Sequence, residues 1–157
     1  MIDIIKKHIA DFSASNWNDY KAACAPDMVY EELATNTRVQ SADEYLKAVQ
    51  KWKRAFPDAK GNITRATASG DQVVVEVLWE GTQSGPLEGP MGAIPPTNKR
   101  VRVNAVIVNT IKNGKISESR HFFDMLSLLT QMGVAPMAGT GAQQPGKGDG
   151  QPSQRRP

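Results

Sequence analysis

The sequence predicts an α+β domain in which helices cover one face of a curved, mixed or antiparallel sheet. Up to residue 56 the apolar side chains recur mainly at helical spacing, whereas residues 60–123 show the alternation of strands. Residues 125–132 return to a helical pattern that ends at Gly133. Helices that precede a run of strands favour a sheet packed on its helices. A sheet that curves around them would leave a cone-shaped pocket open at one end.

Two helices and a short strand are predicted at the start of the chain. The first helix is amphipathic, because apolar residues recur every three or four positions from Ile2 to Phe12. The second covers about residues 17–25 and ends at Pro26. A short strand follows at residues 28–33.

The third helix has the clearest boundaries. Ser41 and Glu44 have the spacing of a capping box, in which each side chain accepts a hydrogen bond from the other's backbone N–H. Pro57 ends the helix, because the residue before a proline avoids helical dihedral angles. The apolar stripe of this helix consists of Tyr45, Val49, Trp52 and Phe56.

Four strands rich in Val, Ile and Thr are predicted at residues 60–69, 72–83, 99–111 and 115–123. The pair Asn113-Gly114 is a strong hairpin signal, because both residues adopt positive φ readily. The Gly- and Pro-rich segment 85–98 is predicted to be a long loop at the pocket mouth. We therefore expect a domain over residues 1–134 and a disordered Gly/Pro/Gln-rich tail over residues 135–157.

The composition excludes several classes of protein. The formal charge is +3, and no cluster of Lys and Arg interleaved with aromatic residues is present before the tail, so no nucleic-acid partner is expected. Cys24 is the single cysteine, and with only two histidines no metal site is expected. The sequence lacks both a signal-peptide core and an apolar run long enough to span a bilayer, which favours a cytoplasmic location.

Five short motifs occur in a fixed order along the chain. They are FPD at 56–58, GTQSG at 81–85, PPTNK at 95–99, NGKISE at 113–118, and LLTQMG at 128–133 a few residues after Asp124. With these motifs, the sequence resembles the SnoaL-like polyketide cyclase family over about residues 2–134. The resemblance implies the cone-shaped fold shared with ketosteroid isomerases and nuclear transport factors.

Three residues depart from the family pattern. Gln83 stands where the family often has His, His121 where an acidic or other polar residue is common, and Arg120 where Trp is frequent. A glutamine cannot relay a proton near neutral pH, whereas a histidine can. If the pocket chemistry needs an imidazole, it has moved to His121 or the activity has been lost.

The resemblance also implies a reaction. It is an intramolecular aldol-type ring closure on a hydrophobic carbonyl compound, with one general base and no cofactor. Asp124 is then the expected catalytic acid/base, and a bend after the last strand would bring His121 into the same cavity. From the residues alone, Asp124 is equally well placed as the N-cap of the last helix, and His121 as a structural histidine.

The remaining candidate residues are predicted to bind the substrate. Gln83 lies on the apolar face of its strand with Trp79; the alternative is an amide whose hydrogen bonds are satisfied at the rim of the pocket. Glu31 is expected to point toward the helices, and the alternative is a place on a solvated strand edge. Stacking on a planar ligand is expected of Trp79, Trp52, Tyr45 and Phe56, and the alternative is plain core packing.

Two other functions stay open at this point. A non-catalytic small-ligand-binding domain would keep the cavity without the base, and an epoxide hydrolase would need Arg102 or Arg120 inside the cone between two acids. A homodimer or higher homo-oligomer is also expected, with Val106, Val108 and Ile116 on an apolar outer face of the sheet.

Overall fold

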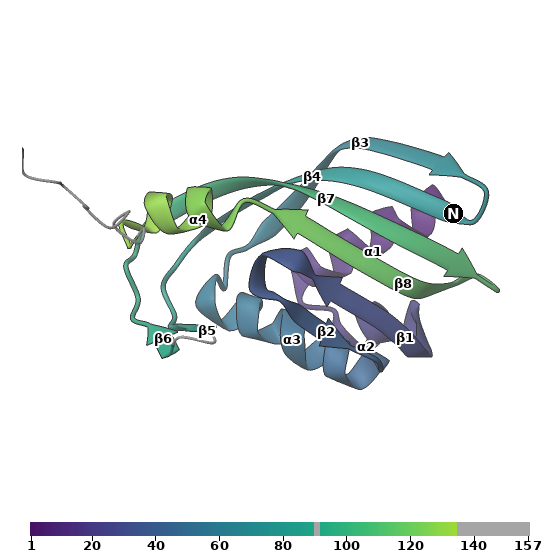
Figure 1. Ribbon diagram of the computed structural model, residues 1–157, viewed down its shortest axis with the longest axis horizontal. Coiled ribbons are helices and arrows are strands. Elements are labelled where there is room, and N and C mark those ends of the chain that lie inside the picture. The colour runs from purple at the N-terminus through teal and green to yellow at the C-terminus, as the bar shows by residue number, and fades with distance from the viewer. Residues whose placement is uncertain (90–91, 135–157) are drawn as a thin grey trace, which may run out of the picture.

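The computed structural model describes residues 1–89 and 92–134; the tail prediction for residues 135–157 lies outside the described residues. Figure 1 shows helices packed against one face of a long, twisted sheet. The helices are α1 (Ile2–Ala14), α2 (Trp17–Ala22), α3 (Ala42–Ala55) and α4 (Met125–Met132), with a 3-10 turn η1 (Leu33–Thr35). The strands are β1 (Cys24–Glu32), β2 (Thr37–Val39), β3 (Lys60–Ser69), β4 (Gln72–Thr82), β5 (Leu87–Gly89), β6 (Gly92–Ile94), β7 (Arg100–Lys112) and β8 (Lys115–Phe123).

The main sheet has the strand order β2-β1-β8-β7-β4-β3. Strands β3, β4, β7 and β8 form the predicted antiparallel meander. Strand β1 joins β8 in parallel, so the sheet is mixed, and it is curved but not closed into a barrel. The predicted α+β fold is therefore confirmed.

Local signals explain most element boundaries. The Ser41 hydroxyl accepts a hydrogen bond from the Glu44 backbone N–H at 3.1 Å, as the capping box predicts. The reciprocal bond differs from the prediction, because the Glu44 carboxylate accepts from the Gln40 backbone N–H at 3.3 Å rather than from that of Ser41. Asn113 and Gly114 have φ values of 51° and 71°, as a tight hairpin between β7 and β8 requires.

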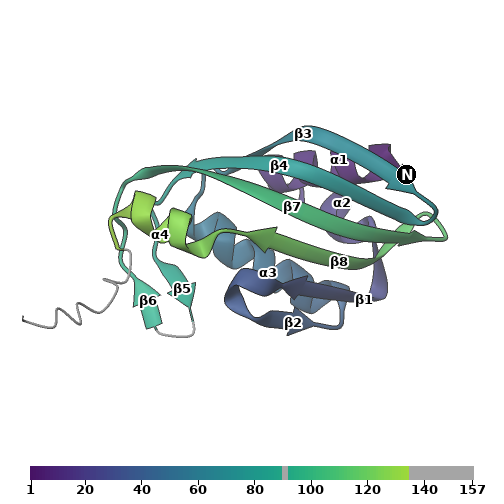
Figure 2. The same cartoon turned by 45° about the horizontal axis from the view of Figure 1, so that its top comes forward.

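Two local predictions differ from the structure. The second helix ends at Ala22 rather than near residue 25, because Cys24 already pairs with Ile116 of β8. Pro26 lies inside β1 at an irregularity of the pairing, where a missing N–H costs little. The predicted loop 85–98 also contains a short hairpin, β5–β6, at the end of the molecule where α4 lies (Figure 2).

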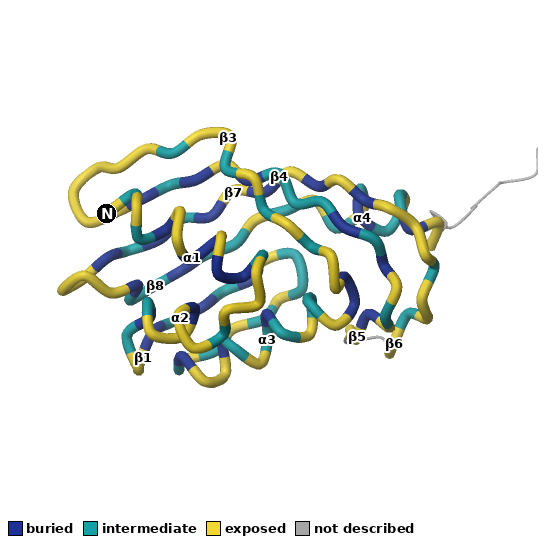
Figure 3. Tube along the Cα trace, turned by 180° about the vertical axis from the view of Figure 1, so that it is seen from behind, coloured by how far each residue is buried: buried dark blue, intermediate teal, exposed yellow. Residues whose placement is uncertain are grey.

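The core lies between the concave face of the sheet and α1–α3, and residues alternate between buried and exposed along β4 and β7 (Figure 3). Ile116 is fully buried in this core, so its predicted place on the outer face is wrong. Val106 lies on the outer face and is 38% exposed, as predicted. A smaller apolar cluster joins α4 to β7 and β5 through Leu128, Met132, Val103 and Leu87.

Candidate active site

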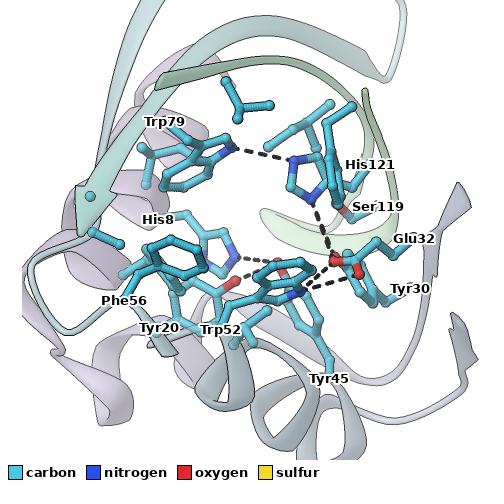
Figure 4. A pocket seen from close by; sticks show the side chains of 18 of the residues that line it. His8, Tyr20, Tyr30, Glu32, Tyr45, Trp52, Phe56, Trp79, Ser119 and His121 are labelled. Carbon is cyan, nitrogen blue, oxygen red and sulfur yellow. Dashed lines mark hydrogen bonds and ion pairs between the residues drawn. The ribbon is translucent and has the colours of Figure 1, made fainter. Parts of the chain in front are cut away.

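A cavity of about 120 Å³ lies between the concave sheet face and helices α1 and α3. Its wall is mainly aromatic and aliphatic, and a few polar groups are set into it (Figure 4). The aromatic and polar residues that line it include His8, Phe12, Tyr20, Tyr30, Glu32, Tyr45, Trp52, Phe56, Trp79, Asn109, Ser119, His121 and Phe123.

Glu32 is the buried carboxylate of this wall, with 5% of its side chain accessible. Both of its oxygens accept hydrogen bonds: Oε1 from the Thr35 hydroxyl at 2.7 Å, and Oε2 from the Tyr30 hydroxyl at 2.7 Å and the Trp52 indole at 2.9 Å. Burial raises the pKa of Glu32 above its ordinary value, although these hydrogen bonds act in the opposite direction. The donors satisfy the ionised form of a carboxylate held away from water.

His121 lies beside Glu32, because the two residues are paired in the parallel ladder between β1 and β8. The Trp79 indole N–H donates to His121 Nε2 at 3.3 Å, so the neutral ring carries its proton on Nδ1. Nδ1 lies 3.3 Å from the Tyr30 hydroxyl and 3.9 Å from Oε2 of Glu32. Burial lowers the pKa of His121 to about 4, so the imidazole is neutral at pH 7.

His121 is more accessible than its carboxylate neighbour. Its side chain is 15% accessible, compared with 5% for Glu32, and it lines the cavity. At 3.3 Å, the hydrogen bond from the Trp79 indole to Nε2 is a long one. A bound molecule can therefore compete with the indole for Nε2.

A second polar cluster lies deeper, against α1. The Tyr20 hydroxyl donates to the Tyr45 hydroxyl at 2.5 Å, and His8 Nε2 lies 3.2 Å from the same oxygen. His8 stacks on Tyr20 with 3.8 Å between ring centroids, and burial lowers its pKa to about 3. His8 was not among the predicted site residues, although it lies one turn from Ile5 and Phe12 on the buried face of the first helix.

The prediction that Glu31 rather than Glu32 points toward the helices is wrong. Glu31 points away from the helices and forms an ion pair with Arg38 of β2, while Glu32 faces the cavity. Strand alternation from the buried residues Met28 and Tyr30 identifies Glu32, and this was the available signal.

The structure places Asp124 outside the cavity wall. Asp124 is exposed, and its carboxylate accepts a hydrogen bond from the Ser127 backbone N–H at 3.1 Å as the N-cap of α4. Asp124 therefore has the capping role that the sequence left open. The bend at the end of β8 does not bring it into the cavity with His121.

Gln83 is fully buried but belongs to the loop rather than to the cavity wall. Its amide nitrogen donates to three backbone carbonyls, at Gly85, Ile94 and Pro95, and its oxygen accepts from the backbone and hydroxyl of Thr97. All of its hydrogen-bonding capacity thus holds the segment that contains β5 and β6.

The four predicted aromatic residues all line the cavity. Trp79 and Trp52 also use their indole N–H groups, the first on His121 and the second on Glu32. Arg102 and Arg120 have side chains 64% and 40% exposed and do not line the cavity, which argues against the arrangement of an epoxide hydrolase.

Among the described residues, no three His, Cys, Asp or Glu side chains gather where they would share a metal ion. Within the same part of the chain, no helix has the length and apolar content needed to cross a membrane.

The curved sheet, its packed helices and the cavity between them define an α+β protein of the ketosteroid-isomerase-like fold. The sequence profile of the SnoaL-like polyketide cyclase family matches residues 3–132. The chain therefore belongs to the SnoaL-like polyketide cyclase family.

Solved structures share this fold at low sequence identity. A proposed SnoaL-like polyketide cyclase from Jannaschia sp. is 22% identical with a TM-score of 0.76, over 86% of this chain and 92% of that one. IdmH, a proposed polyketide cyclase from Streptomyces antibioticus, is 23% identical with a TM-score of 0.72, over 84% and 97%. A ketosteroid-isomerase-like protein from Catenulispora acidiphila, in complex with trimethylamine, is 18% identical with a TM-score of 0.71, over 83% and 92%. No curated protein matches the chain.

Proposed function

We propose that this protein is a cofactor-independent cyclase or isomerase that acts on a hydrophobic carbonyl compound by general acid/base catalysis. The observation that carries the proposal is the His121 imidazole, which is neutral, lines an apolar cavity and has the Glu32 carboxylate behind it. An imidazole that is unprotonated at pH 7 is available to accept a proton from an activated carbon, and a positioned base contributes roughly 10²–10⁴ in rate.

In the proposed first step, Nε2 of His121 takes a proton from a carbon that lies between two carbonyl groups of the substrate. The electron pair of the broken C–H bond moves into the neighbouring carbonyl and forms an enolate. The imidazolium that results is stabilised by the Glu32 carboxylate, whose Oε2 lies 3.9 Å from Nδ1. The Trp79 N–H, released from Nε2, becomes available to the enolate oxygen.

The second step depends on the substrate. In a cyclase, the enolate carbon attacks a second carbonyl of the same molecule, a C–C bond forms, and the new alkoxide takes back the proton from His121. In an isomerase, the proton returns to a different carbon. Both routes balance without a metal or an organic cofactor.

Asp124 remains the base that the family resemblance proposes, and the same chemistry would apply to its carboxylate. Its exposure and its bond to the Ser127 N–H support His121 over Asp124. We therefore assign the proton transfer to His121 and give Asp124 the role of helix cap.

The test uses a cyclic β-keto methyl ester built on cyclohexanone, dissolved in D₂O and followed by proton NMR. We expect the protein to accelerate exchange of the proton between the two carbonyls at least about 100-fold over buffer at the same pH. If the ester binds saturably but its proton exchanges at the buffer rate, the proposed enzymatic function is refuted.

A non-catalytic ligand-binding domain is the second candidate. Both oxygens of Glu32 already accept hydrogen bonds, which is also the arrangement of a purely structural carboxylate. The Catenulispora acidiphila protein of the same fold was solved with trimethylamine bound, so this fold holds small molecules without a turnover being implied. Binding without exchange in the test above would favour this candidate.

We also propose a homodimer that covers the outer sheet face. Val106 and Phe122 face each other across β7 and β8 and are 38% and 39% exposed. Light scattering after size-exclusion chromatography tests this, because Val106→Asp should then yield monomers. We also propose that the protein is located in the cytoplasm.

A further inference from the structure

The size of the cavity limits what the proposed site accepts. Its volume is about 120 Å³. Drug-sized ligands occupy pockets of roughly 300–1,000 Å³, and an engineered cavity of about 150 Å³ binds benzene. The enclosed space between the sheet and the helices therefore corresponds to a single six-membered ring with small substituents, and a larger group would have to extend through the open side.

The walls that define this space are themselves fixed by packing. Trp52 lies edge-on to Phe123 at 5.6 Å between ring centroids, and Trp79 lies edge-on to Phe12 at 5.1 Å. Tyr30 and Tyr45 pack with their centroids 4.4 Å apart. A second fused ring would have to displace interlocked aromatic side chains, which is costly in a close-packed interior.

The charge of the lining selects against anions. Among the described residues that line the cavity there is no Lys or Arg, and the two acidic residues are Glu32 and Glu80. The two histidines of the lining, His8 and His121, are both neutral at pH 7. A carboxylate or phosphate ligand would lose its hydration without gaining a counter-charge, and it would lie near the Glu32 carboxylate.

Both acidic side chains of the lining already have partners, which weakens what they offer to a cation. Both Glu32 oxygens are occupied by the hydroxyl and indole donors of Thr35, Tyr30 and Trp52. A cation would have to share the carboxylate with these three donors, which already take up most of its acceptor capacity. Glu80 is paired with Arg102 at 2.9 Å, and the accessible neutral polar group is the ring of His121.

We infer that the substrate is a neutral, single-ring carbonyl compound that enters the cavity as a free molecule, without a charged carrier or acid group inside the pocket. That the substrate contains a carbonyl group rests on the proposed function, whereas the limits on its size and charge rest on the cavity alone.

The experiment measures binding by isothermal titration calorimetry of the full chain at pH 7, with four probes. Acetophenone is the neutral single-ring probe, benzoate its anionic counterpart, protonated benzylamine its cationic counterpart, and acetonaphthone its two-ring counterpart. We expect acetophenone to bind at least tenfold more tightly than each of the other three.

Two variants test the physical reasons. Val49→Ala removes two methyl groups from the cavity wall on α3 and should improve binding of acetonaphthone at least threefold relative to acetophenone. Glu32→Gln removes the buried charge and should increase the affinity for benzoate at least threefold relative to the affinity for acetophenone. Failure of either relative gain would overturn the corresponding limit.

The outcomes separate this inference from the proposed function, because no turnover is measured. Benzoate or benzylamine binding as tightly as acetophenone would overturn the limit on charge, and acetonaphthone binding as tightly would overturn the limit on size. If the affinities follow the expected order but proton exchange occurs at the buffer rate, the ligand class is supported and the enzymatic function is refuted.

Discussion

Glu32 and His121 are partners in the parallel ladder of β1 and β8, and Oε2 of Glu32 lies 3.9 Å from Nδ1 of His121. The register of the two strands places both side chains on the concave face of the sheet. Tyr30 connects the two groups, since its hydroxyl donates to Glu32 and lies 3.3 Å from His121 Nδ1. The backbone pairing of strands distant in sequence thus places a carboxylate and an imidazole side by side in the wall of the cavity.

The first prediction concerns the Glu32 carboxylate. Glu32→Gln keeps the size of the side chain but removes the charge that stabilises the His121 imidazolium in the proposed mechanism. We expect exchange of the β-keto ester proton to fall by up to about 100-fold, because the base His121 remains but loses the charge beside it. The NMR exchange rate at saturating ester measures this.

The neighbouring residue provides a matched control. Glu31→Gln makes the same chemical change on the opposite face of β1, where Glu31 pairs with Arg38. Exchange should stay within a factor of about two, because an exposed ion pair contributes little to the structure. Equal losses in both variants would show that a general change of charge, and not the cavity carboxylate, causes the effect.

The second prediction concerns acidic pH. His121 and His8 have pKa values of about 4 and about 3 in the folded protein, whereas an unfolded histidine titrates near 6.5. Between about pH 6.5 and pH 4 the unfolded chain therefore binds more protons than the folded chain. The free energy of unfolding should fall as the pH falls through this window. The raised pKa of Glu32 acts in the opposite direction and offsets part of the loss.

Two measurements check this prediction. Urea unfolding at several pH values should give a lower free energy of unfolding at pH 5 than at pH 7. The chain has only two histidines, so NMR can follow both rings directly. Neither ring should become protonated above about pH 5, and a midpoint between 6 and 7 for His121 would show that its ring is not buried as described.

The third prediction concerns the cap of α4. Asp124→Ala removes the acceptor of the Ser127 N–H and should lower the free energy of unfolding by about 1 kcal/mol. Asp124→Asn preserves an acceptor at the same place and should lower it by only a few tenths of a kcal/mol. Thermal unfolding followed by circular dichroism distinguishes the two, and equal losses would argue against a capping role.

The fourth prediction concerns the loop that Gln83 holds. Gln83→Ala removes a fully buried amide and leaves the Thr97 N–H and several carbonyls without partners. We expect a loss of about 2 kcal/mol in the free energy of unfolding, typical of unsatisfied buried polar groups. Gln72→Ala, an exposed position at the start of β4, should change it by no more than about 0.5 kcal/mol. Similar values for both variants would show that the amide is not holding the loop.

Much of the fold was predictable because its signals are local. The N-cap at Ser41, the turn at Asn113 and the alternation of residues 72–82 each depend on neighbours in the sequence, and all three occur as predicted. The end of the second helix was not predictable in this way. Pairing of Cys24 with Ile116 draws residues 24–25 into a strand, and the sequence separation of that contact hides it from any local pattern.

The site was predictable only in part, for a related reason. Aromatic residues such as Trp52 and Trp79 were expected to line a cavity and do so. The choice between Glu31 and Glu32 depended on which face of β1 meets the helices, and the buried neighbours Met28 and Tyr30 decide it. The buried amide of Gln83 looked like a binding group, because a sequence does not show which backbone carbonyls will surround it.

The central claim is that the proton transfer takes place in the cavity at His121 rather than at the exposed Asp124. The most direct measurement compares deuterium exchange of the β-keto ester by His121→Gln and by Asp124→Asn under identical conditions. We predict that His121→Gln lowers the exchange rate at least about 100-fold while Asp124→Asn retains the wild-type rate. The opposite order, with exchange lost in Asp124→Asn and kept in His121→Gln, would contradict the account.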